Sequence, residues 1–336
     1  MKSPFDALPE EARDALVEAE IPEWTSPMLA TLTDDPFSDP EWIYERKLDG
    51  VRILAFRRSG GAVRLMSRNQ KNRNAAYPEI VEALETLDLE EFVLDGEVVA
   101  FDGRVASFRK LQPRMNLEDP DKARASGVPV YYYAFDAPYL AGYDLCALPL
   151  RHRKRLLRDA IDYSDPIRFT THRNEDGEAF LEEACEKGWE GLIAKKASGA
   201  YLHSRSKDWL KFKCVNEQEF VIGGFTDPRG ERIGFGALLI GYYADGELKY
   251  AGKVGTGFDD ETLEALSDRL ESIERKTPPF EDRAELPSDG VHWVTPKMVC
   301  EVGFTEWTNG GKLRHPRFLG LRHDKDPGDV VRERPT

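Results

Sequence analysis

Hydrophobic and polar positions divide the chain into two regions of different texture. Between residues 42 and 215, short runs rich in Val, Ile, Phe and Tyr alternate with amphipathic segments, and such runs favour strands over helices. The expected strands are residues 42–47, 51–57, 63–67, 92–101, 130–135, 192–196 and 209–215. The expected helices are residues 78–87, 151–161 and 178–187, preceded by a short acidic helix over residues 9–20.

After Cys214 the pattern becomes richer in strands. Strand-like runs cover residues 219–226, 237–243, 248–254 and 291–307, and the apolar stripe of one helix consists of Leu263, Leu266, Leu270 and Ile273. A handful of strands and one helix match the size of a small barrel such as an OB-fold. The predicted fold class is therefore α+β with two domains. The expected divisions are an acidic leader over residues 1–22, antiparallel sheets with flanking helices over residues 23–215, and a β-barrel over residues 216–330.

Charge is distributed unevenly along the chain. Its 336 residues include 47 Lys and Arg and 61 Asp and Glu, so the net charge of −14 argues against a purely electrostatic binder of nucleic acid. Residues 1–41 hold eleven of the acids and two of the bases, so this segment alone carries −9, and the acidic leader of residues 1–22 is expected to be a solvated cap. The remaining residues carry −5, which leaves room for a phosphate-binding face, because local charge sets the field that a ligand meets.

The lack of two kinds of apolar segment predicts a cytoplasmic protein without a membrane partner. No run of 18 apolar residues is found, and no apolar segment follows Lys2. The four cysteines stand far apart and form no CxxC pair, which excludes the usual zinc ribbon and predicts four reduced thiols rather than disulfides. These cysteines are Cys146, Cys185, Cys214 and Cys300.

Six short motifs carry residues that are suited to chemistry. In the first, Gly50 permits a tight turn after a predicted strand, and that turn presents either a reactive or an ordinary solvated Lys47. The six motifs are Lys47-Leu48-Asp49-Gly50-Val51-Arg52, Ser67-Arg68-Asn69, Asp95-Gly96-Glu97, Ala134-Phe135-Asp136, Glu190-Gly191-Leu192-Ile193-Ala194-Lys195 and Trp209-Leu210-Lys211-Phe212-Lys213.

Three of these motifs each allow a functional and a structural interpretation. Glu97 lies in an apolar strand, so it needs a metal ion, a sugar or a salt bridge to offset its desolvation. Phe135 either stacks on a base or belongs to the core. The strand period of two places Lys211 and Lys213 on one face, where they bind phosphate inside a cleft or are solvated outside one.

Taken in order, the motifs resemble those of the covalent nucleotidyltransferase superfamily, and within it the ATP-dependent DNA ligases. A C-terminal motif of the same family matches Arg314, Pro316 and Phe318, followed by Arg322-His323-Asp324-Lys325. The resemblance covers about residues 24–327 and is strongest to the ligase module of bacterial ligase D and its stand-alone relatives. It implies an adenylation domain over residues 23–215 and an OB-fold domain over residues 216–330, which agrees with the change of texture.

The resemblance implies an enzyme that seals nicks in double-stranded DNA during repair. Lys47 would attack the α-phosphorus of ATP and form lysyl–AMP, a case of covalent catalysis by an amine. AMP would pass to the 5′-phosphate of the nick, and the 3′-hydroxyl would then displace it. Lys211 and Lys213 would disfavour the charged form of the attacking amine.

Individual roles also follow from the resemblance. Asp49 joins Lys47 among the catalytic residues, and Glu97 and Glu190 would hold Mg²⁺ or Mn²⁺. Glu45 would contact adenine, on which Phe135 would stack. The phosphate and ribose contacts are assigned to Arg52, Arg68, Glu97, Lys195, Arg205, Lys211 and Lys213. The pyrophosphate leaving group is assigned to Arg322, Asp324 and Lys325, a role that requires a hinge near residues 215–217.

Alternatives from other classes remain at this point. An mRNA-capping or RNA-joining nucleotidyltransferase shares the motif around Lys47, although Ser67-Arg68-Asn69 is more typical of DNA ligases. A catalytically silent nick-binding scaffold is the third possibility. The expected partners are nicked DNA and DNA-repair proteins, and the expected state is a monomer.

Overall fold

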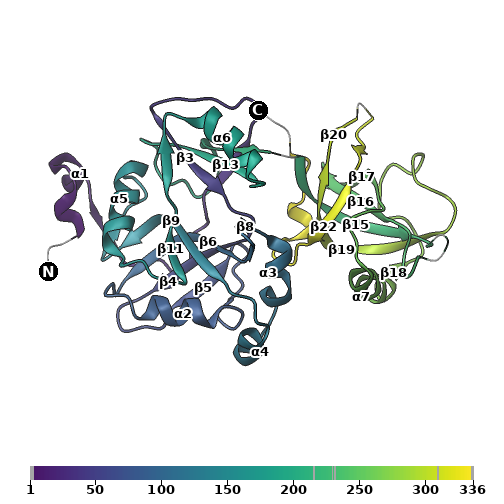
Figure 1. The fold of residues 1–336 in the computed structure, drawn as a ribbon, viewed down its shortest axis with the longest axis horizontal. Coiled ribbons are helices and arrows are strands. Elements are labelled where there is room, and N and C mark those ends of the chain that lie inside the picture. The colour runs from purple at the N-terminus through teal and green to yellow at the C-terminus, as the bar shows by residue number, and fades with distance from the viewer. Residues whose placement is uncertain (1–3, 215, 229, 231, 309, 334–336) are drawn as a thin grey trace. The chain divides into compact units, whose positions relative to one another are not determined.

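The computed structural model describes residues 4–214, 216–228, 230, 232–308 and 310–333, which form two compact units on either side of residue 215 (Figure 1). The expected hinge includes Val215, which lies outside the described residues. Within those residues, no helix has the length and apolar character needed to cross a membrane.

The first unit contains a large sheet with the strand order β1-β10-β9-β6-β4-β5, to which β11 adds beside β9. The strands are β1 (Val17–Glu18), β4 (Val51–Arg57), β5 (Arg64–Ser67), β6 (Phe92–Val99), β9 (Tyr131–Leu140), β10 (Tyr143–Asp144) and β11 (Ile167–Phe169). One face packs against apolar residues from α2 (Pro78–Glu85), α3 (Phe108–Met115) and α5 (Leu150–Ala160). Smaller elements are η1 (Pro4–Ala7), α1 (Glu10–Asp14), α4 (Pro120–Ala125), and the hairpin of β7 (Phe101–Asp102) and β8 (Val105–Ala106).

A second sheet in this unit has the order β12-β3-β13-β14-β2. Its strands are β2 (Leu29–Leu32), β3 (Trp42–Lys47), β12 (His172–Asn174), β13 (Gly191–Lys196) and β14 (Arg205–Lys213). Tyr44, Leu192 and Phe212 form a core with Phe180 of α6 (Gly177–Glu186), which lies against β3 and β13 in Figure 1. Glu45, Lys47, Lys195, Lys211 and Lys213 alternate with these core residues and are directed to the face opposite α6, whereas Arg46 shares a row with Leu192 and Phe212.

The second unit is built on the strand order β17-β16-β15-β19-β18, with β22 beside β19. Leu263, Leu266 and Leu270 of the expected helical stripe pack into its core, which confirms that prediction. The elements are β15 (Asn216–Thr226), β16 (Leu238–Ala244), β17 (Glu247–Val254), α7 (Asp260–Glu271), β18 (Glu274–Arg275), β19 (Val291–Phe304), β20 (Glu306–Trp307), β21 (Leu313–Arg314), β22 (Arg317–Leu321) and η2 (Pro327–Asp329).

The predicted acidic helix over residues 9–20 is wrong beyond α1. The helix ends at Asp14, and Val17 and Glu18 instead pair with Asp144 and Tyr143 of β10. Pairing with a distant strand therefore overrides the local helical pattern. Two pairings are also parallel rather than antiparallel, namely β2 with β14 and β11 with β9.

The prediction of four reduced thiols is also wrong. Cys185 in α6 and Cys214 after β14 form a disulfide, with their Cα atoms 5.2 Å apart. Only Cys146 and Cys300 are free thiols among the described residues. The packing of α6 across the second sheet brings together two cysteines that are 29 residues apart in sequence, and no spacing rule signals this pairing.

Candidate active site

Three neighbouring strands of the second sheet, β3, β13 and β14, bring residues of three motifs together. Residues directly opposite each other in antiparallel strands point to the same face. The register places Lys47, Gly191 and Lys213 in one row, and Glu45, Ile193 and Lys211 in the next. A third row contains Ile43, Lys195 and Trp209. The face opposite to α6 is therefore rich in lysines that come from separate motifs.

Gly191 creates space at the centre of the first row. Its φ is +146°, and a Cβ atom there would stand 1.9 Å from the carbonyl oxygen of Phe212. Only glycine fits this position without moving the strand. The absence of a side chain leaves Lys47 and Lys213 facing each other across the middle strand.

Lys47 forms an ion pair with Glu190, which precedes β13. Burial by itself would raise the pKa of Glu190, but the positive charges of Lys47 and Lys213 outweigh it and hold the pKa below its usual range. The second carboxylate oxygen, Oε2, is buried and has no hydrogen-bond partner among the described residues. This oxygen is therefore a candidate ligand for a cation.

Glu45 lies deeper on the same face and is 2% exposed. Its two oxygens face Lys154 of α5 at 2.5 Å and Lys195 at 2.7 Å. Burial would raise the pKa of Glu45, but these two lysines lower it, whereas burial reduces the pKa of Lys195 to about 8. Glu45 is thus part of a buried ion-pair network, and its expected contact with adenine remains a prediction.

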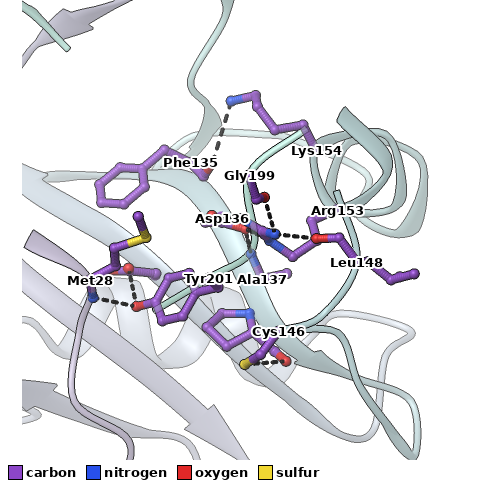
Figure 2. Close-up of polar contacts among 12 residues, drawn as sticks. Met28, Phe135, Asp136, Ala137, Cys146, Leu148, Arg153, Lys154, Gly199 and Tyr201 are labelled. Carbon is purple, nitrogen blue, oxygen red and sulfur yellow. Dashed lines mark hydrogen bonds and ion pairs between the residues drawn. The ribbon is translucent and has the colours of Figure 1, made fainter. Parts of the chain in front are cut away.

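The large sheet contributes a second polar cluster around Asp95, which is fully buried. The Nε and Nη2 atoms of Arg52 each donate to one oxygen of Asp95 at 2.5 Å. The hydroxyl of Tyr201 also donates to Asp95 at 2.6 Å and accepts a hydrogen bond from the N–H of Met28 at 3.2 Å (Figure 2). Arg52 donates to the carbonyl of Met28 as well, so the cluster ties the irregular segment before β2 to the large sheet.

Phe135 lies between cations of the two sheets. The Arg52 guanidinium carbon is 4.5 Å and the Lys195 Nζ is 4.3 Å from its ring centroid. The ring also meets Trp209 edge to face, and the residue is 8% exposed. Phe135 is therefore a buried core residue at the site, and its stacking on adenine remains a prediction.

The segment around Phe135 is held by α5. Arg153 donates to both oxygens of Asp136 at 2.8 and 2.9 Å, and also to the carbonyls of Leu148 and Gly199 (Figure 2). Lys154 donates to the carbonyl oxygen of Phe135 at 3.4 Å. Sequence reasoning missed both basic residues. Their signal was a helix whose apolar stripe of Leu residues also contains an Arg and a Lys.

The remaining predicted residues of this unit have varied surroundings. Asp49 accepts a hydrogen bond from the N–H of Phe108 at 2.8 Å, so it anchors the turn after Lys47 to the start of α3. Glu97 is half-buried opposite Arg52 in the register of β4 and β6. Arg68 follows β5 and is half-buried, whereas Arg205 is exposed at the start of β14 and donates to the carbonyl of Ala30.

In the second unit, the predicted residues gather in a separate charged cluster. Arg322 donates to Asp324 at 3.0 and 2.9 Å and to Glu301 at 3.1 Å, and Lys325 pairs with Glu219 at 2.8 Å. Burial would lower the pKa of Arg322, but the carboxylates of Asp324 and Glu301 outweigh it and raise the pKa. The fold therefore assembles these residues from β15, β19 and the segment after β22.

Comparison with known protein families identifies the chain. Residues 27–213 match the ATP dependent DNA ligase domain, and residues 231–325 match the ATP dependent DNA ligase C terminal region. The chain belongs to the ATP-dependent DNA ligase family. The resemblance stated from the motifs is thereby confirmed, as is the expected fold class of a nucleotidyltransferase domain followed by a C-terminal domain.

Curated relatives of this ligase-family chain include longer proteins. It is 40% identical over 327 residues to the multifunctional non-homologous end joining protein LigD of Pseudomonas aeruginosa, a match covering 94% of this chain and 37% of that protein. It is 32% identical over 345 residues to a DNA ligase of Hyperthermus butylicus, a match covering 91% of this chain and 56% of that ligase. The chain thus spans about two fifths of LigD and just over half of the archaeal ligase.

A solved structure similar to this ligase-family chain is described as mycobacterial DNA ligase D complexed with ATP and MES. The two sequences are 34% identical, and the match covers 92% of this chain and 98% of that one with a TM-score of 0.65. The similarity extends over both units of the present chain.

Proposed function

We propose that this chain is an ATP-dependent DNA ligase that seals a nick between a 3′-hydroxyl and a 5′-phosphate through a lysyl–AMP intermediate on Lys47. The observation that carries the proposal is the position of Lys47. It lies at the end of β3, paired with Glu190 and facing Lys213 across the gap at Gly191. An amine is thus set beside cations that suit a phosphate.

The first step forms one bond and breaks another. Lys47 attacks the α-phosphorus of ATP, a phosphorus–nitrogen bond forms, and the bond to pyrophosphate breaks. The amine must lose its proton, and the adjacent Glu190 carboxylate is placed to accept it. Lys211 and Lys213 on the same face stabilise the charge that builds on the phosphate.

The second and third steps return Lys47 to its starting state. An oxygen of the DNA 5′-phosphate attacks the AMP phosphorus, the bond to Lys47 breaks, and the amine regains its proton. The 3′-hydroxyl then attacks the DNA phosphorus and AMP leaves. Further contacts to ribose and phosphates are assigned to Arg52, Arg68, Glu97, Lys195 and Arg205, and contacts to adenine to Glu45 and Phe135.

A divalent cation fits the carboxylates of this site. No group of three or more His, Cys, Asp or Glu side chains within the described ranges is placed to hold a metal by itself. Mg²⁺, however, commonly binds one or two carboxylates together with substrate phosphates. The buried Oε2 of Glu190, which has no hydrogen-bond partner among the described residues, is such a ligand. We assign the half-buried Glu97 as the second. The cation, Mg²⁺ or Mn²⁺, would neutralise phosphate charge.

The second unit would act on the leaving group. We assign Arg322, Asp324 and Lys325 to the orientation of pyrophosphate in the first step, which requires the OB-fold domain of residues 216–330 to close on the adenylation domain of residues 23–215 and then reopen. The hinge is assigned to residues 215–217. The same proposal includes action as a monomer on chromosomal DNA in the cytosol, together with DNA-repair proteins.

Self-labelling tests the proposal. The wild-type chain is incubated with α-labelled ATP and Mg²⁺, and the protein is assayed for covalent label and for sealing of a nicked duplex. We expect label and sealing in the wild type and neither in Lys47→Ala, with Lys276→Ala, an exposed lysine, as the matched control.

Four outcomes would contradict parts of the proposal. Label on Lys47→Ala would exclude Lys47 as the nucleophile. Preferential labelling by GTP would favour a capping-type enzyme, and sealing of RNA rather than DNA strands would favour an RNA ligase. Binding of nicked DNA by a wild-type chain that takes no label would favour a silent scaffold.

A further inference from the structure

A cavity of about 410 Å³ opens in the first unit, lined by three arginines and three aromatic residues. Arg46 comes from β3, Arg104 from the turn between β7 and β8, and Arg168 from β11. The aromatic residues are Phe101, Tyr131 and Tyr133. None of these residues has a role in the function proposed above.

The aromatic rings hold two of the guanidinium groups in place. The guanidinium carbon of Arg168 is 3.9 Å from the ring centroid of Tyr131, and its Nη1 donates to the hydroxyl of Tyr133 at 2.8 Å. The guanidinium carbon of Arg46 is 4.3 Å from the ring centroid of Trp189 and 5.9 Å from that of Phe101. Such stacking fixes the arginines before any ligand arrives.

The positive charge of this cavity is only partly balanced. Arg168 pairs with Asp165, whereas Arg46 donates to the carbonyl oxygen of Arg104 at 3.4 Å, and neither of these two arginines forms an ion pair within the described part of the chain. The Nε atom of Arg46 is buried without a hydrogen-bond partner there, and burial lowers the pKa of this guanidinium. A ligand with negative charge would offset the cost of holding Arg46 in this setting.

The cavity neighbours the end of β3 that carries Lys47. Arg46 directly precedes Lys47 but points to the opposite face of β3, in a row with Leu192, and Tyr133 lies opposite Glu97 in the register of β9 and β6. A DNA strand brought to Lys47 extends along the surface of this unit, and its phosphates recur at short intervals. Guanidinium groups beside aromatic rings suit a phosphate together with its sugar or base.

We propose that this cavity binds a backbone phosphate of the DNA substrate through Arg46, Arg104 and Arg168, with the adjacent sugar or base against the aromatic residues. The inference rests on the proposed function for the identity of the ligand. It concerns residues outside the six motifs and makes the cavity a positioning site for DNA rather than a site for ATP.

The test uses Arg104, an exposed residue in the turn between β7 and β8. The turn is uncrowded, since a Cβ atom added at the preceding Gly103 would meet no atom within 4 Å. Binding of a fluorescent nicked duplex is measured by anisotropy at several salt concentrations, in parallel with labelling by α-labelled ATP. For Arg104→Ala, we expect the Kd to rise about 3- to 10-fold and the slope of log K against log salt to fall by about one unit. Labelling of Lys47 should be unchanged.

Arg155→Ala is the matched control, since Arg155 is exposed on α5 and does not line the cavity. Unchanged affinity and slope in Arg104→Ala, or an equal change in Arg155→Ala, would overturn the inference. Loss of ATP labelling without loss of DNA affinity would assign the cavity to a nucleotide instead. A wild type that binds DNA through Arg104 without labelling or sealing would contradict only the proposed function.

Discussion

At the scale of single residues, the site depends on charges that are buried and paired. Glu45, Asp95 and Asp136 are at most 2% exposed, and each meets at least one Lys or Arg. A buried charge is stable in a fold only when a partner of opposite charge and further hydrogen bonds offset its desolvation. The motif residues therefore serve two purposes, because several that are assigned to ligands also hold the two sheets together.

Asp95 tests this structural role, since it receives two hydrogen bonds from Arg52 and one from Tyr201. Asp95→Asn removes the charge that balances Arg52, so we expect the free energy of unfolding to fall by about 3 kcal/mol. Tyr201→Phe removes the hydrogen bond to Asp95 and the one accepted from the N–H of Met28, and should cost about 1–2 kcal/mol. Denaturant unfolding measures both values. Equal losses in the two variants would show that the charge of Asp95 is not the dominant contribution.

At the scale of elements, local pattern and tertiary pairing contribute differently. β3 and β4 have the bounds that the apolar runs predicted, because both strands combine β-branched and aromatic residues with a turn at Gly50. The helix α3 was missed although Ser107 caps it and Phe108, Leu111 and Met115 form its buried stripe. β2 and β11 are short, and they exist because a neighbouring strand pairs with them.

The disulfide between Cys185 and Cys214 gives a prediction at this scale. It closes a loop of 29 residues that includes β13 and β14. These two strands carry Gly191, Lys195, Lys211 and Lys213 of the site. The chain-entropy model assigns such a cross-link about 3–4 kcal/mol of stability. We expect a thiol reductant to lower the unfolding midpoint of the wild type in denaturant.

The matched control is the double variant Cys185→Ser, Cys214→Ser, which keeps Cys146 and Cys300. Its unfolding midpoint should already be low and should not respond to reductant. If the wild type and the double variant show the same midpoint with and without reductant, the cross-link does not contribute to stability.

At the scale of the whole molecule, the two units hold different parts of the proposed chemistry. The first contains Lys47 and the lysines that face it, and the second contains the cluster of Arg322, Asp324 and Lys325. Three chemical steps with different leaving groups suit an enzyme in which one unit acts in some steps only. The net charge of −14 is compatible with DNA binding, because the arginine cavity and the lysine face concentrate positive charge locally.

Lys325 separates the first step from the later ones. Since pyrophosphate leaves only in the first step, Lys325→Ala should reduce labelling by α-labelled ATP about 10²-fold and still seal a nick that is already adenylated. Both activities are measured on the same preparation, with Lys276→Ala as the control. An equal loss of sealing on the adenylated nick would contradict a role confined to the first step.

The sequence by itself determined the family, the α+β class, the division near residue 215 in hydrophobic texture, and the identity of the motif residues. These features depend on local sequence, because each strand run and each short motif consists of contiguous residues. The tertiary structure alone decided which motifs share a face, how Lys154, Tyr201 and Trp209 join the site, and that Cys185 meets Cys214. Those contacts arise from strand register and helix packing between distant segments, and no local pattern encodes which distant partner a residue meets.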